Sequence, residues 1–271
     1  MTGGLRAELA KQARRPASWL LLAVGVVLSL TFGYVVPFAG LSGTGPAGDR
    51  GLAAMLPAQF VGSALGGLPV FVGSLALIFG VLAVGSEYGW ETWKTVFAQG
   101  SSRLSVYAAK LMAVAAGALV LVLALFAMAA GASAVVAVLQ NQPAHWPSFV
   151  EIVRGLAAGW LITAMWAALG VLLAVAFRSV ALPIGLGLVW LLAVQNLLAS
   201  VAAPLLPWVA SAQRGLPGPN AGSLVAGVDP LASAPGVSAL VGSGQAAVVV
   251  AGYLVAFAAV GGWLVQRRDI S

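Results

Sequence analysis

The sequence contains no cysteine and only one histidine, and charged residues make up 7% of its 271 residues. Without cysteine, the chain can form no disulfide, thiolate metal site or cysteine nucleophile. The lone histidine, His145, cannot provide the histidine pair of a zinc protease, and we interpret it as an ordinary loop residue. Lys11, Lys94 and Lys110 follow Ala, Trp and Ala, whereas a P-loop requires the order Gly-Lys-Ser/Thr. The chain is therefore not expected to hydrolyse ATP through a P-loop.

The sequence is instead rich in apolar residues: 61% of its residues are hydrophobic and the mean hydropathy is +1.02. Soluble proteins are about 25% charged, so the composition indicates an integral membrane protein. A helix needs about 20 apolar residues to cross the hydrocarbon core. The sequence therefore predicts an all-α fold that forms a single transmembrane domain over residues 1–271. Pro69 is expected to kink the second span of this domain. The six predicted spans are about 17–38, 61–85, 104–139, 152–177, 180–200 and 244–265.

The distribution of basic residues predicts the orientation of these spans. Cytoplasmic loops of membrane proteins carry an excess of lysine and arginine. With both termini cytoplasmic, ten bases lie inside and three, Arg50, Arg154 and Arg214, lie outside. The net charge of +6 is therefore explained by membrane topology, and it does not indicate nucleic-acid binding. The inside set is Arg6, Lys11, Arg14, Arg15, Lys94, Arg103, Lys110, Arg178, Arg267 and Arg268.

Residues 5–15 form an amphipathic pattern that predicts an interfacial helix before the first span. Leu5 and Leu9 fall on one face, and the basic residues fall on the other. The alternative is that these bases only set the topology. Lys110, near the inner end of the third span, is expected to extend its ammonium group to the interface.

The predicted spans carry no acid or base at their centres. Ion-coupled carriers place ionisable groups there because a buried charge is retained only for function. The pattern therefore indicates that a partner supplies the energy. Gln195 and Asn196, near the outer end of the fifth span, could contact a substrate or bond to a neighbouring helix.

The segment 86–110 lies between two apolar runs of membrane-spanning length, is not strongly apolar itself, and holds both acids and bases. On a helix over 87–98, Trp90 and Trp93 share one face, and Glu87, Glu91 and Lys94 share another. This pattern predicts a cytoplasmic elbow that receives force from a separate protein. The alternative is a short helix that only anchors two spans at the membrane surface.

The segment 201–243 between the last two spans contains six prolines. A short apolar helix within it is expected to lie at the outer leaflet or to dip into it. Such a re-entrant segment requires protein around its ends, because lipid cannot satisfy its free backbone groups. The residues of this helix are Leu205, Leu206, Trp208 and Val209.

The segment GSEYGWETWKTVFAQGSSRLSVYAAKL resembles the elbow of the ABC-2 permeases, the membrane subunits of type-2 ABC exporters in bacteria. That elbow reads Glu-x-x-x-Gly-Thr, followed by Pro-x-Ser-Arg and then Lys. Two departures occur, since Glu91 replaces the glycine and Gly100-Ser101 replaces the proline region. The matching residues are Glu87, Thr92, Ser102, Arg103 and Lys110.

The resemblance implies a permease subunit of an ATP-driven exporter in the bacterial cytoplasmic membrane. Two cytoplasmic ATPase subunits, which hold the ATP and Mg²⁺, would dock on the elbow, and this chain would carry no cofactor. A second copy or a homologous permease would complete the substrate path within the lipid. The alternatives are an ion-coupled carrier and a structural membrane subunit. The residues expected to couple to the ATPase are Glu87, Trp90, Glu91, Thr92, Trp93, Lys94 and Arg103.

Overall fold

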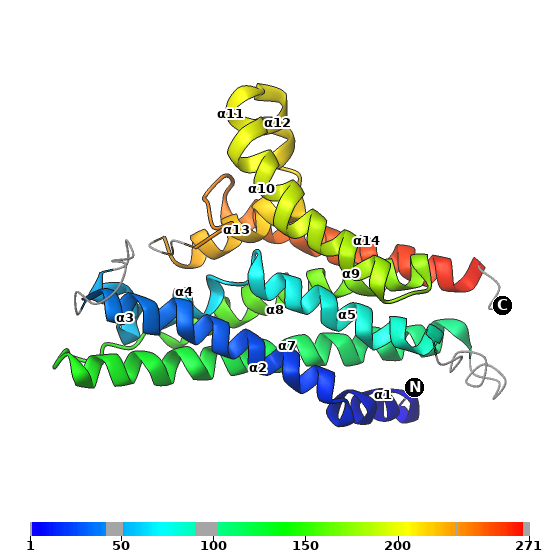
Figure 1. Ribbon diagram of the computed structural model, residues 1–271, viewed down its shortest axis with the longest axis horizontal. Helices are drawn as coiled ribbons and strands as arrows, with labels where there is room; N and C mark the ends of the chain where they lie inside the picture. Colours follow the sequence, from blue (N-terminus) through cyan, green and yellow to red (C-terminus); the bar gives the residue numbers. More distant parts are fainter. Residues whose placement is uncertain (1, 42–50, 90–101, 231, 233, 268–271) are drawn as a thin grey trace.

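The computed structural model is a bundle of helices (Figure 1), and it describes residues 2–41, 51–89, 102–230, 232 and 234–267. Within those ranges there is no β-strand, so the predicted all-α class is confirmed. Six helices there are long and apolar enough to cross a membrane, which also confirms the predicted number of spans. They are Pro16–Leu41, Phe71–Tyr88, Arg103–Leu139, Phe149–Phe177, Ala181–Leu205 and Ser243–Arg267.

The chain turns a corner between α1 (Thr2–Arg14) and α2 (Pro16–Leu30). Arg15 is extended there, and proline suits the first position of α2 because a helix leaves that N–H unbonded. The first span then continues through a π-helical segment into α3 (Val36–Leu41). In Figure 1, α1 lies beside the start of α7, at the end of the bundle where the described chain also ends.

The predicted span 61–85 is divided into two helices, α4 (Phe60–Leu65) and α5 (Phe71–Gly89). Gly66 and Gly67 disfavour a helix, and Pro69 offers no N–H to continue one. The structure therefore has a turn where the sequence predicted a kink. The shorter helix α4 packs against α7, and only α5 has the length of a span. Two 3₁₀ turns, Leu52–Met55 and Pro57–Gln59, precede them.

The third and fourth spans agree closely with prediction, and local capping explains where they begin. In α7 (Arg103–Leu139), the Ser102 side chain accepts a hydrogen bond from the Ser105 N–H at 3.2 Å. In α8 (Phe149–Phe177), Ser148 and Glu151 form a capping box. His145 lies in the loop between the two helices, as predicted, and its side chain is exposed.

Beyond α8 the chain projects away from the bundle and then returns to it (Figure 1). The fifth span runs from α9 through α11 and contains two π-helical segments, and the predicted outer segment 201–243 includes α12 and α13. Trp208 on α12 is 69% exposed, whereas most of α13 is buried. The element bounds are α9 (Ala181–Leu188), π (Val189–Val194), α10 (Gln195–Leu197), π (Leu198–Ala202), α11 (Ala203–Leu205), α12 (Pro207–Gln213), α13 (Pro217–Val228) and α14 (Ser243–Arg267).

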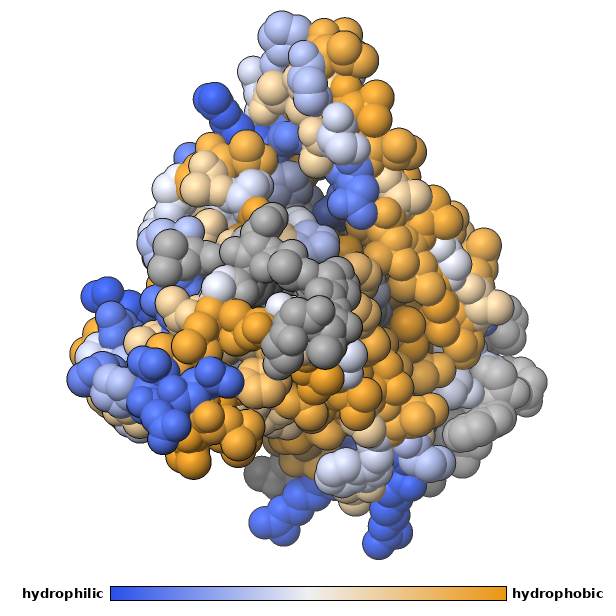
Figure 2. All heavy atoms as spheres, turned by 60° about the vertical axis from the view of Figure 1, so that its left-hand side comes forward, coloured by the Kyte–Doolittle hydropathy of each residue, from blue (hydrophilic) through white to orange (hydrophobic). Residues whose placement is uncertain are grey.

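The core lies between α5 and α8, which pack together more extensively than any other pair of described helices. Glycine allows this approach: a Cβ atom on Gly80 would overlap the backbone of Ala167, and one on Gly170 would overlap that of Leu77. Trp166 is fully buried beside them. Apolar side chains continue from the core to the surface and cover much of the face in Figure 2, as expected of a chain surrounded by lipid.

Candidate functional site

Five charged side chains meet where the end of α5, the start of α7 and the α1–α2 corner lie together. We call Glu8, Lys11, Arg15, Glu87 and Lys110 the ion cluster. Lys11 Nζ lies 2.7 Å from Glu8 Oε1 and 3.1 Å from Glu87 Oε1. Lys110 Nζ lies 3.1 Å from Glu8 Oε1 and 2.5 Å from Glu87 Oε2. Each carboxylate therefore bridges two lysines, and α1 is attached to both α5 and α7.

Arg15 completes the cluster from the corner between α1 and α2. Its Nη2 lies 3.8 Å from Glu87 Oε1, and its Nη1 donates a hydrogen bond to the Leu82 carbonyl at 3.0 Å. The guanidinium group thus binds the last turns of α5 through a carboxylate and a backbone oxygen. This pair of contacts fixes the position of the corner relative to α5.

The cluster is held in a poorly hydrated environment, because the side chains of Glu87 and Lys110 are each 2% exposed. Burial alone raises the pKa of Glu8, but Lys110 and Lys11 outweigh it and hold that pKa below its ordinary value. Burial alone lowers the pKa of Lys11, but Glu8 and Glu87 raise it above its ordinary value. Glu8 and Lys11 are therefore both charged near neutral pH.

The sequence predicted that the Lys110 ammonium group extends to the membrane interface, and in the structure this group is instead enclosed by protein. It lies two turns into α7 and is buried, because two carboxylates from other helices neutralise it there. Glu87, which was predicted to share a helix face with Glu91 and Lys94, lies near the end of α5 and is buried, with its carboxylate turned toward α1 and α7. The elbow assignment itself stays a prediction.

Most of the predicted coupling residues lie outside the described part of the chain. These are Trp90, Glu91, Thr92, Trp93 and Lys94, and with them the predicted helix beyond residue 89. Arg103, at the first position of α7, is described, and its Nη1 donates to the Gln266 carbonyl at 3.3 Å. It thereby joins the start of α7 to the last turn of α14, where a cation is also favoured by the helix dipole.

Gln195 and Asn196, the predicted substrate contacts, lie on α10 between the two π-helical segments of the fifth span. Gln195 is buried against Gly218 of α13, and its Nε2 has no hydrogen-bond partner among the described residues. Asn196 is exposed and donates to the Leu192 carbonyl at 2.7 Å. The structure therefore places the two amides on different sides of one helix.

The sequence alone did not identify Glu8, Lys11 or Arg15 as members of the site. Glu8 is the only acid in an otherwise basic N-terminal segment, which is a signal that it pairs with something. Its main partner, Lys110, is 102 residues away in sequence, so spacing could not identify it. No group of acids and histidines suited to a metal ion occurs in the described ranges.

Comparison with known proteins identifies a family. The sequence model described as ABC-2 family transporter protein matches residues 4–194, which include most of α1 and all members of the ion cluster. No curated protein matches the chain. The matched region also includes the segment between α5 and α7 on which the family resemblance was based.

Proposed function

We propose that this chain, which belongs to the ABC-2 transporter family, is the permease subunit of an ATP-driven exporter. A permease of this family is the membrane component of a transporter and is not itself the catalyst. The ATP and Mg²⁺ are bound by two separate ATPase subunits on the cytoplasmic side of a bacterial membrane. Both termini of this chain lie on that side, as the ten inside bases predict.

The observation that carries the proposal is the rigid base formed by the ion cluster. Residues 90–101 are connected to α5 at Gly89 and to α7 just before Arg103. Glu87 and Lys110 join these two helix ends directly, and both also bind α1. A force applied to residues 90–101 would therefore move three helices together. In this role Glu87 is a positioning residue, and the contacts with the ATPase belong to the residues that follow it.

The fifth span supports a second permease copy as the partner in the membrane. Its outer half and α12 project from the bundle and expose several large apolar side chains. A second copy would bury them and would place the two fifth spans beside a shared path. Gln195 lies between two π-helical segments, a distortion often found at functional sites. The exposed side chains are Leu197, Val201, Leu205, Leu206 and Trp208.

The coupling role is tested with Trp93→Ala in the transporter purified from its native host, together with the ATPase subunit that accompanies the wild type. We expect Trp93→Ala to reduce both the amount of co-purified ATPase and the ATP-dependent export from vesicles, because a large side chain at a docking contact contributes disproportionately to affinity. Trp146→Ala is the matched control, since Trp146 is half-exposed in the α7–α8 loop at the opposite end of the bundle.

Three outcomes contradict the proposal. The first is that Trp93→Ala and Trp146→Ala retain equal ATPase binding and equal export. The second is export that continues without any nucleotide hydrolase and follows an ion gradient, which would identify the protein as a secondary carrier. A membrane subunit that binds the ATPase but never moves a solute would indicate the structural role instead.

A further inference from the structure

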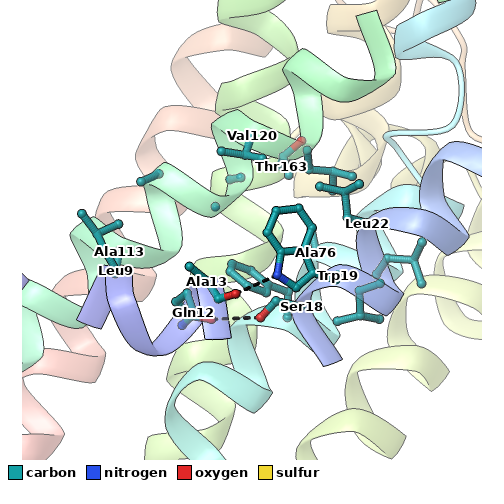
Figure 3. A pocket seen from close by; sticks show the side chains of 17 residues that line it. Leu9, Gln12, Ala13, Ser18, Trp19, Leu22, Ala76, Ala113, Val120 and Thr163 are labelled. Atoms are coloured by element: carbon teal, nitrogen blue, oxygen red, sulfur yellow. Dashed lines mark hydrogen bonds between the residues drawn. The ribbon is translucent and has the colours of Figure 1, made fainter. Parts of the chain in front are cut away.

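An apolar cavity of about 320 Å³ lies between the α1–α2 corner and the helices α5 and α7. Its walls come from Leu9 on α1, Trp19 and Leu22 on α2, Ala76 on α5 and Val120 on α7 (Figure 3). A group the size of a water molecule occupies about 30 Å³, so the cavity has room for roughly ten such groups. An extended hydrocarbon chain fits this volume and this lining.

Small residues on α7 create the cavity, and Trp19 borders it. Ala113, Ala116 and Gly117 line the cavity. At these positions the α7 wall of the cavity consists only of helix backbone and methyl groups. The Trp19 ring is 56% exposed, and its N–H donates to the Ala13 carbonyl at 2.8 Å (Figure 3). A tryptophan with a satisfied N–H and an open ring suits the level of lipid headgroups.

The polar end of the cavity lies at the corner between α1 and α2. Gln12 and Ser18 line it there, and the Ser18 hydroxyl donates to Gln12 Oε1 at 3.3 Å. These two side chains are the polar border of a lining that is otherwise nearly all apolar. A molecule with an apolar tail and a polar head would therefore place its head at this corner.

The charge at the corner favours a negatively charged head. Residues 2–19 contain four bases and a single acid, Glu8, which already bridges two lysines of the ion cluster. Two of the bases, Arg6 and Arg14, lie outside the cluster and are exposed. A basic residue near an anionic membrane surface contributes appreciably to binding. The cavity thus supplies an apolar region and the α1–α2 corner supplies a cationic region, and both face the same leaflet.

From this arrangement we propose that the chain binds an anionic phospholipid at a defined site, with one acyl chain in the cavity and the phosphate beside Gln12, Ser18 and Arg14. The lipid packs against the α1–α2 corner, which Arg15 attaches to α5. Its binding therefore stabilises the docked position of α1. The site does not depend on ATP coupling, so it can be tested without the ATPase.

The test is native mass spectrometry of the purified full chain from micelles that contain equal amounts of phosphatidylglycerol and phosphatidylcholine. We expect wild type to retain phosphatidylglycerol preferentially. Ala116→Phe fills the cavity and should abolish the retained lipid. Ala127→Phe is the matched control, because it adds the same ring to an exposed position of α7 outside the cavity, and it should retain the lipid. Arg14→Gln should reduce the preference for phosphatidylglycerol by about fivefold while leaving the cavity open.

Each other result overturns the proposal. Equal retention of the two lipids by wild type means that the corner does not select a charge. Equal retention by Ala116→Phe and Ala127→Phe means that the lipid lies around the protein and not in the cavity. Loss of lipid from both phenylalanine variants, with circular dichroism that matches wild type, likewise separates the lipid from this cavity. Displacement of the lipid by an exported molecule would assign the cavity to the transported solute.

Discussion

At the scale of single residues, the buried charges decide how the N-terminal segment is held. Glu8, Glu87 and Lys110 are buried, Lys11 and Arg15 are partly exposed, and each carboxylate has more than one cationic partner. Removing one member of a buried ion pair is costly because the remaining charge stays desolvated, whereas replacing both by apolar groups can be nearly neutral. Glu87 is the most consequential member, since it contacts all three cations of the cluster.

Glu87→Gln should destabilise the protein by about 3–5 kcal/mol, because it leaves Glu8 as the only carboxylate facing the three cations of the ion cluster. Adding Lys110→Met should recover part of that loss by removing one of the stranded charges. The measurement is the unfolding midpoint in detergent for both variants and for the double variant. Arg154→Gln, an exposed site, serves as the control and should change stability by no more than about 0.5 kcal/mol. Additive effects of the two cluster substitutions would show that the pair is not coupled.

At the scale of helices, the sequence predicted what local patterns determine and missed what distant contacts determine. The long apolar run of α7 and the capped start of α8 could both be read from the chain. The division of the second span at Gly66 to Val70 was read as a kink, because proline and glycine signal an interruption but not its geometry. The docking of α1 depends on partners far away in sequence, so its charges indicated an interface but not an anchor.

The contact between α5 and α8 should tolerate no added side chain. Gly80→Ala and Gly170→Ala place a methyl group against the backbone of the opposite helix, so each should force the helices apart and lower stability by about 1–3 kcal/mol. The unfolding midpoint in detergent checks this. Gly131→Ala on α7 is the control, since a Cβ atom there meets nothing within 4 Å, and alanine should be neutral or stabilising by about 1 kcal/mol. If all three variants are equally stable, the close approach of α5 and α8 is not required.

At the scale of the whole molecule, the bundle has one compact side and one projecting arm. The helices α5, α7, α8 and α14 form the compact side, while the outer half of the fifth span and α12 form the arm (Figure 1). The sequence indicated a short helix in this region, but a single chain gives no signal for the direction in which such a helix projects. The side chains that would contact another copy could therefore be identified only from the structure.

If the arm is the contact between two permease copies, Leu205→Ser combined with Trp208→Ser should convert most of the dimer into single subunits. The reason is that association within lipid depends on close packing of side chains, and both of these are large and exposed in one chain. Mass photometry of the protein in nanodiscs would measure the two species. Val248→Ser with Val255→Ser on α14 provides equally exposed control positions. If the wild-type protein is found only as single subunits, the arm is not a contact between two permease copies.

The attachment of α1 to α5 and α7 also offers a practical means of observing the transporter at work. Because the natural sequence has no cysteine, a thiol introduced at the exposed Ala7 would be the sole labelling position on the chain. A fluorophore placed there would lie on α1, which the ion cluster attaches to α5 and α7, and it would leave residues 90–101 unmodified. Its fluorescence would report movement of α1 during transport.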